Sequence, residues 1–188
     1  MAESTLTREE RIALANRRTG LLVFQISWIM VFVCLMLVNV QIRANFASWP
    51  PEGVVPLERV LPTIAALGLI VSGVFAWRGL NAIRADRAAA LRQNWLLAIL
   101  LGAGFIAIMA YEWVTVPFSE QYGALFRVMT AFHALHALVI GGMMLRVYRR
   151  AAAGAYSAAD HWAVEGAAKL WYFVVAAWML FYAVLYII

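Results

Sequence analysis

The stretch Thr19–Ile42, TGLLVFQISWIMVFVCLMLVNVQI, is the clearest indication of the fold, because it runs from Arg18 to Arg43 without a charge between them. An α-helix rises about 1.5 Å per residue, so this stretch would extend about 36 Å and cross a hydrocarbon core of about 30 Å. It is too long for the apolar part of a cleaved signal peptide, which has about 7–15 residues. We therefore predict a retained transmembrane helix.

Four more uncharged runs also reach the length of about 17–25 residues that a crossing helix needs. They are Val60–Trp77, Gln93–Tyr111, Val128–Leu145 and Leu170–Ile188. We predict an all-α integral membrane protein, a single domain over 1–188. After a tail at 1–18, its five transmembrane spans are expected at about 19–42, 60–82, 93–116, 124–147 and 160–187.

The composition excludes an ordinary soluble domain: 65% of the residues are hydrophobic, 13% are charged, and the mean hydropathy is +0.80. The net charge of +5 does not indicate a nucleic-acid partner, because the basic residues stand singly or in small groups between the apolar runs. That pattern is typical of membrane topology. A single cysteine, Cys34, allows no disulfide within the chain.

The basic residues also predict the orientation, since Lys and Arg accumulate on the cytoplasmic side. Twelve lie in the N-terminal tail and in the second and fourth connections, and three (Arg43, Arg59 and Arg127) lie on the opposite side. We expect the N-terminus in the cytoplasm and the C-terminus on the outer, periplasmic side.

Local signals mark the segments between the spans. Thr7–Glu10 has the spacing of a capping box, which would start a short helix along the membrane surface; a solvated tail is the alternative. Pro50 and Pro51 exclude a helix from the loop that follows the first span. Ser157–Asp160 is a second capping-box candidate, which predicts that the last helix begins well before the membrane and carries Glu165 near the inner interface.

Four ionisable residues in or near the spans are candidates for a structural polar cluster or lipid contact: Glu112, His133, His136 and Glu165. Glu112, between two aromatic residues, either meets water at the interface or is buried as a hydrogen-bonded or proton-handling group. His133 and His136 share one helix face, so they cannot supply opposed axial ligands to one haem, and no thiolates accompany them for zinc. We expect neutral histidines that bond to neighbouring helices or lipid, and no catalytic, cofactor or metal site in the chain.

Aromatic residues form a second candidate group, which we interpret as packing rather than as a cofactor site. Its tryptophans are Trp49, Trp113, Trp171 and Trp178. Small residues of the last span, such as Ala167 and Ala177, would let another helix approach closely.

Four motifs follow one another along the chain. They are Trp49-Pro50-Pro51 with Leu61-Pro62-Thr63; Leu101-Gly102 with Phe105 and Tyr111-Glu112-Trp113; Tyr122-Gly123 with Phe132-His133-Ala134-Leu135-His136; and Glu165 with Trp171, Phe173, Val174 and Trp178. In this order they resemble subunit III of the haem–copper oxidases in its bacterial five-helix form.

The resemblance implies a non-catalytic accessory subunit in the inner membrane of a bacterium. It would pack against catalytic subunit I, with subunit II in the complex, hold phospholipids in a cleft between helix groups and support proton uptake by subunit I during aerobic respiration. Haem and copper would reside in the partner subunits, and this chain would bind neither.

Five positions depart from the family pattern. They are Trp28 for Glu, Met109 for Gln, Ala134 for Gly, Tyr172 for His and Val175 for Asp. These changes weaken the expectation of a direct proton role. The alternatives are a companion subunit of a nitric oxide reductase or quinol oxidase and, from a different class, a haem-binding membrane anchor. A proton-coupled transporter is disfavoured, because the sequence shows neither broken helices nor inverted repeats.

Overall fold

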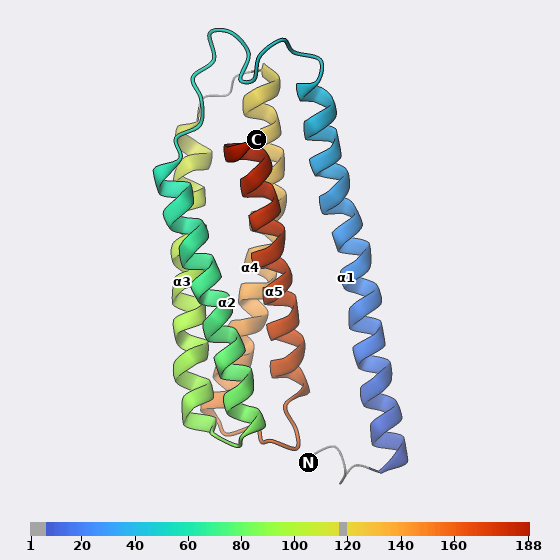
Figure 1. Ribbon diagram of the computed structural model, residues 1–188. Helices are drawn as coiled ribbons and strands as arrows, with labels where there is room; N and C mark the ends of the chain where they lie inside the picture. The colour runs from blue at the N-terminus through green and yellow to red at the C-terminus, as the bar shows by residue number, and fades with distance from the viewer. Residues whose placement is uncertain (1–6, 117–119) are drawn as a thin grey trace.

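Five long helices dominate the computed structural model, which describes residues 7–116 and 120–188 (Figure 1). They are α1 (Arg8–Arg43), α2 (Val60–Arg84), α3 (Ala88–Thr115), α4 (Glu120–Ala152) and α5 (Trp162–Tyr182), which continues as a π-helical turn, Ala183–Ile187. All five are long and apolar enough to cross a membrane. The predicted all-α fold with five membrane-spanning helices is confirmed.

The helices run up and down between two ends of one elongated bundle (Figure 1). We call one of them the N-terminal end; it contains the start of α1, the α2–α3 turn and the start of α5. The other is the C-terminal end, where the loop 44–59 and residue Ile188 lie.

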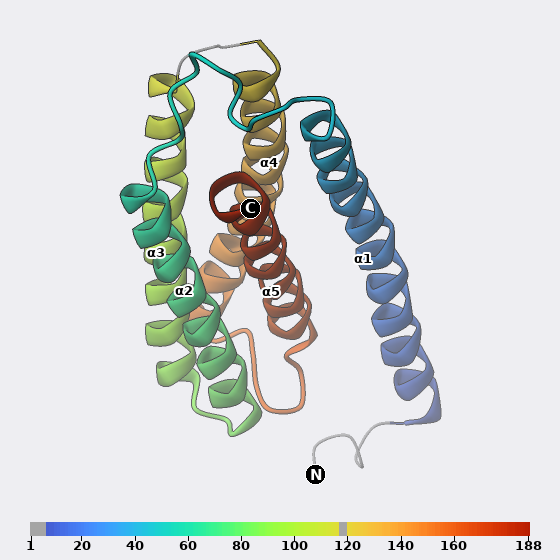
Figure 2. The same ribbon diagram turned by 45° about the horizontal axis from the view of Figure 1, so that its top comes forward.

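Helix α1 stands at the edge of the bundle. The other four helices pack in a ring, α2 on α3, α3 on α4, α4 on α5 and α5 on α2. Both ribbon views show α1 beside α4 and α5 and away from α2 and α3 (Figure 1, Figure 2). Only Phe32 and Asn39 of α1 are buried, whereas α5 buries residues along its whole length. Helix α5 is therefore the central helix, and α1 is the least integrated one.

One interlock at the centre of the ring joins three helices. Trp171 of α5 is buried against Gly102 of α3, and its Nε1 donates to Ser72 Oγ of α2 at 2.9 Å. Ser72 in turn donates to the Ala98 carbonyl of α3 at 2.7 Å. The Trp171 N–H and the Ser72 hydroxyl, both buried, thus each have a partner. We call Ser72, Ala98, Gly102 and Trp171 the Trp171 interlock.

The first capping box is confirmed. Thr7 Oγ1 accepts from the Glu10 N–H at 3.3 Å, and Glu10 Oε2 accepts from the Thr7 N–H at 2.8 Å. It does not start a separate short helix along the membrane surface, however. The helix that begins at Arg8 continues without a break to Arg43. No proline interrupts this stretch, and Gly20 alone costs a helix only about 1 kcal/mol.

The second capping box does not start a helix, so that part of the prediction was wrong. The last helix does begin ahead of the uncharged run, and it carries Glu165 in its first turn. The Ser157 hydroxyl accepts from the Asp160 N–H at 3.2 Å, but the Ser157 N–H donates to the Asp160 carbonyl, which closes a turn. His161 then has φ −139°, outside the helical region, and α5 begins at Trp162. The loop with Pro50 and Pro51 is non-helical, as predicted.

Candidate functional site

The structure does not bring the four predicted polar residues into one cluster. Glu165 lies in the first turn of α5 at the N-terminal end, and Glu112 in the last turn of α3 at the C-terminal end. Glu112 meets Tyr186, which lies beyond the far end of α5 and about 30 Å from Glu165 along the helix axis. His133 and His136 lie between them near the midpoint of α4. These residues therefore occupy separate sites.

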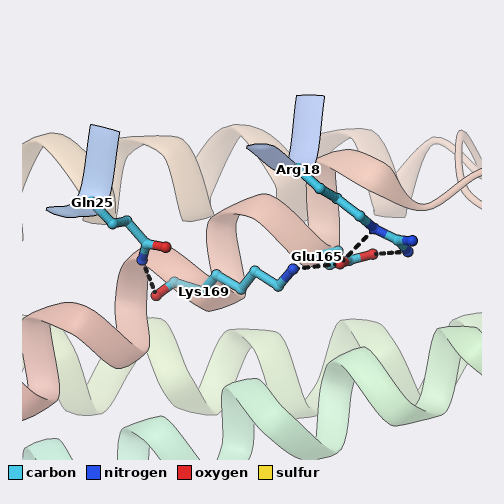
Figure 3. A network of polar contacts seen from close by, with 4 residues as sticks. All are labelled: Arg18, Gln25, Glu165 and Lys169. Carbon is cyan, nitrogen blue, oxygen red and sulfur yellow. Dashed lines mark hydrogen bonds and ion pairs between the residues drawn. The ribbon is translucent and has the colours of Figure 1, made fainter. Parts of the chain in front are cut away.

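Glu165 is the centre of an ion network that ties α1 to α5 (Figure 3). Its buried carboxylate pairs with Arg18 of α1 at 3.0 Å and with Lys169, one turn further along α5, at 2.7 Å. Gln25 of α1 donates to the Lys169 carbonyl at 3.0 Å. We call these four residues the Glu165 network; they hold the N-terminal half of α1, which otherwise buries no residue before Phe32.

A groove of about 330 Å³ opens beside this network between α1 and α5. Its walls are Arg18, Thr19, Leu21, Leu22, Gln25 and Lys169. Two cationic side chains, Arg18 and Lys169, flank the Glu165 carboxylate next to apolar walls. This combination suits a ligand with an anionic head and an apolar body.

Glu112 forms the contact at the opposite end. Its carboxyl is buried and accepts from the Tyr186 hydroxyl at 3.2 Å, which joins α3 to the π-helical turn after α5. Arg43 of α1 donates to the Val184 carbonyl of the same turn at 3.2 Å. Hydrogen bonds from polar side chains thus join the end of α5 to α3 and to α1.

Replacing Tyr186 with phenylalanine is expected to lower the thermal midpoint of the detergent-extracted protein. The ring would remain, but the buried Glu112 carboxyl would lose its hydroxyl donor, at a cost of about 1–3 kcal/mol. Tyr111→Phe is the matched control, because the Tyr111 side chain is 59% exposed. Equal midpoints for the two variants would show that the Glu112 contact contributes nothing to stability.

His133 lies in an aromatic pocket between four helices. Its ring centroid is 5.6 Å from that of Phe105, 5.1 Å from Trp178 and 6.1 Å from Phe32. Within residues 7–116 and 120–188, neither ring nitrogen has a hydrogen-bond partner. The same described residues contain no group of three His, Cys, Asp or Glu side chains arranged to hold a metal ion. The surroundings of His133 are those of a packed core residue.

His136 instead faces α1 at the surface of the bundle. Its ring is half-buried and meets Trp28 edge-on, with centroids 4.5 Å apart. Its Nδ1 bonds to the Phe132 carbonyl at 2.7 Å. Trp28 stands at the position where the resemblance expected a glutamate, so an indole now packs on His136 in place of a carboxylate.

The four tryptophans divide into two kinds. Trp171 and Trp178 of α5 are buried in the core. Trp49 and Trp113 lie at the C-terminal end, where arginine guanidinium groups cover their rings: Arg43 at 5.7 Å and Arg127 at 5.0 Å. The second pair has the amphipathic surroundings of an interfacial position.

Sequence reasoning missed several residues that the structure places at these contacts. From the sequence, Arg18 and Arg43 indicate only the orientation of the chain, and Ser72 and Tyr186 are not recognisable as polar partners. The sequence indicates only that Arg18 and Arg43 flank an uncharged run and that Ser72 and Tyr186 lie inside such runs. Asn39 was also missed: its side chain is buried, and Nδ2 donates to Met129 Sδ at 3.5 Å.

Asn39→Leu is expected to raise the thermal midpoint. Asn39 Oδ1 has no donor among the described residues, and a buried polar atom without a partner costs about 1–3 kcal/mol. Leucine has a similar shape and removes that cost. Gln41→Leu, at an exposed position of the same helix, controls for the gain in hydrophobicity. A lower midpoint for Asn39→Leu than for the control would contradict the prediction.

Comparisons with known proteins find one family. A family model described as cytochrome c oxidase subunit III matches residues 1–188. The chain is similar to cytochrome c oxidase subunit 3 of Thermostichus vulcanus, with 33% identity over 178 residues, 92% of this chain and 87% of the relative. It is 29% identical to that of Synechocystis sp., over 92% of this chain and 76% of the relative. The likeness to the protein of Lumbricus terrestris, 32% identity, covers 74% of this chain and 55% of the relative.

Proposed function

Because the chain belongs to the cytochrome c oxidase subunit III family, we propose that it is a non-catalytic accessory subunit which stabilises catalytic subunit I of a bacterial haem–copper terminal oxidase. The observation that carries the proposal is the family match over residues 1–188, on a chain with five helices able to cross a membrane. Both features fit a subunit whose working surface is the membrane-embedded bundle itself.

The proposal places the N-terminus in the cytoplasm and the chain in the inner membrane of a bacterium. The start of α1 and the α2–α3 and α4–α5 connections lie at the same end of the bundle (Figure 1). Twelve of the fifteen basic residues lie in these connections or in the helix segments that adjoin them, which supports a cytoplasmic N-terminal end.

Phospholipid binding is part of the proposal, and the groove beside the Glu165 network supports it. Arg18 and Lys169 line its wall near the N-terminal end, where lipid head groups would lie. Leu21 and Leu22 continue the wall toward the interior, as acyl chains require.

Support of proton uptake is proposed to be indirect, through the stability of subunit I. At three of the positions that depart from the family pattern, packed side chains stand in place of ionisable or amide groups. Trp28 packs on His136, Met109 is buried, and Val175 lies against Gly73. These side chains offer no group that could pass a proton on.

Haem and copper are assigned to the partner subunits. His133 is enclosed by aromatic rings. His133 and His136 are three residues apart on one helix, so they could not supply two opposed axial ligands to a single haem. Binding to nucleic acid is not part of the proposal.

The test is purification of the tagged chain from its native membranes in mild detergent, followed by mass spectrometry of the co-purifying chains and a visible spectrum. We expect a haem–copper catalytic subunit in stoichiometric amount, and its sequence would identify oxygen or nitric oxide as the substrate and cytochrome c or quinol as the donor. Recovery of the chain alone, stable and bearing haem, would reject the proposal and favour the membrane anchor.

A further inference from the structure

A seam on the bundle surface carries two polar groups that the Glu165 network and the core do not use. It lies between α1 and α4 and is formed by Phe24, Trp28, Leu135, His136 and Val139; we call it the Trp28 seam. The Trp28 ring touches those of Phe24 and His136, with centroids 4.4 and 4.5 Å away. Leu135 and Val139 flank His136 on α4 and are 59% and 54% exposed. The α4 side of the seam is therefore exposed.

The two polar groups have opposite hydrogen-bonding character. A carbonyl only accepts, so His136 Nδ1 carries the hydrogen in its bond to Phe132, and in the neutral ring Nε2 is an acceptor. Trp28 Nε1 is a donor only. No hydrogen-bond partner for Trp28 Nε1 or His136 Nε2 is found within residues 7–116 and 120–188. Both rings are half-buried, so these groups lie at the surface rather than in the core.

The depth of the seam restricts what can cover it. His136 is the middle residue of α4, and Trp28 lies near the middle of the uncharged run Thr19–Ile42. At that depth neither water nor a lipid head group is at hand, and acyl chains neither donate nor accept hydrogen bonds. Polar side chains in such a position commonly bond to another transmembrane helix.

The outward surface of α2 provides a contrast. Leu67 and Val71 of α2 are 58% and 45% exposed, and around them Ile64 and Val74 are also exposed. This surface has no open polar group at mid-depth, because Ser72 bonds inside the Trp171 interlock. Lipid satisfies the α2 surface fully, whereas it leaves the Trp28 seam with an unpaired donor and acceptor.

We infer that the Trp28 seam docks against a transmembrane helix of the catalytic subunit, through a side chain that both donates and accepts a hydrogen bond, such as Ser, Thr, Tyr, Asn or Gln. One such group bridges Trp28 Nε1 and His136 Nε2, while Phe24, Leu135 and Val139 pack around it. The inference rests on the proposed function, which supplies the partner, and adds the surface and the chemistry of the contact.

Site-specific photo-crosslinking in native membranes tests the surface. Leu135→p-benzoylphenylalanine probes the seam, and Leu67→p-benzoylphenylalanine on α2 is the control at equal exposure. After illumination and purification, Leu135 is expected to link to the catalytic subunit in several-fold higher yield than Leu67. Links from Leu135 to lipid only or to a second copy of this chain, in a preparation that still contains the catalytic subunit, would overturn the inference and leave the accessory function intact. Absence of the catalytic subunit would overturn both.

A second pair of variants tests the hydrogen bond. Trp28→Phe keeps an aromatic ring and removes the N–H, and Trp77→Phe makes the same change at an exposed position of α2. The fraction of this chain retained on the catalytic subunit is measured while the detergent concentration is raised. Trp28→Phe is expected to reduce that fraction several-fold, with Trp77→Phe unchanged. Equal retention of the two variants would overturn the hydrogen-bonded contact.

Discussion

Gly102→Ala is expected to cause a large loss of stability. A Cβ at Gly102 would stand 2.6 Å from Cζ2 and 2.7 Å from Cη2 of Trp171. The indole is buried and rigid, so it can only move away as a whole, and its Nε1 then leaves Ser72 Oγ. Overpacking of a core costs about 1–3 kcal/mol, and a lost buried hydrogen bond adds about 1 kcal/mol. The thermal midpoint and the amount of chain in the membrane should both fall.

Gly104→Ala provides the matched control on the same helix. A Cβ at Gly104 meets nothing within 4 Å, so that variant should equal or slightly exceed the parent protein, since alanine favours a helix by up to about 1 kcal/mol over glycine. Equal thermal midpoints for Gly102→Ala and Gly104→Ala would show that Trp171 can move away from residue 102 without loss of stability. Trp171→Phe, which removes the same hydrogen bond without the clash, separates the two causes.

The second large effect is expected at Arg18. Arg18→Leu leaves the buried Glu165 carboxylate with Lys169 as its ion-pair partner on α5, and α1 loses its only ion pair to α5 among the described residues. Removing one partner of a fully buried pair costs about 3–5 kcal/mol, and because Arg18 is 38% exposed we expect about 1–2 kcal/mol. The start of α1 should then be cut faster by trypsin in membranes, because it separates from α5.

Arg17→Leu removes the same charge one residue earlier. Arg17 is exposed, and no contact to the Glu165 network is found for it. Cleavage at the start of α1 should therefore remain at the parent rate, and faster cleavage in Arg18→Leu alone would identify the ion pair as the cause. If both variants were cut equally fast, the general loss of positive charge would be responsible instead. Glu165→Gln should reproduce the Arg18 effect, since the amide binds neither cation as an ion.

The helices could be predicted from the sequence because the membrane imposes a length on every crossing segment. Each of the five uncharged runs meets that length. The Thr7 capping box and the Pro50-Pro51 loop were predicted for a similar reason, since each depends on neighbouring residues only. Ser157 shows the limit of such signals. Its hydroxyl accepts the expected hydrogen bond, but its own N–H closes a turn with the Asp160 carbonyl, and the backbone at His161 is not helical.

The contacts between helices could not be predicted in the same way, because each depends on a pairing that the sequence does not record. Arg18 and Glu165 are 147 residues apart, and Tyr186 and Glu112 are 74 apart. Tyr and Arg at the ends of spans are also common as interfacial anchors, so their composition alone did not separate a polar partner from an anchor. His133 and His136 were predicted to share one helix face. They point in slightly different directions around the helix, so His133 lies in the core and His136 lies at the surface.

The position of α1 at the edge of the bundle has a consequence for biosynthesis. Helix α1 is synthesised before α5, yet the groups that bind its polar side chains, the Glu165 carboxylate and the Lys169 and Val184 carbonyls, belong to α5 and the turn after it. Helix α1 is therefore made before its polar partners on α5, although it can already contact α4 through Trp28 and Asn39. The polar contacts between α1 and α5 therefore form late in folding rather than at its start.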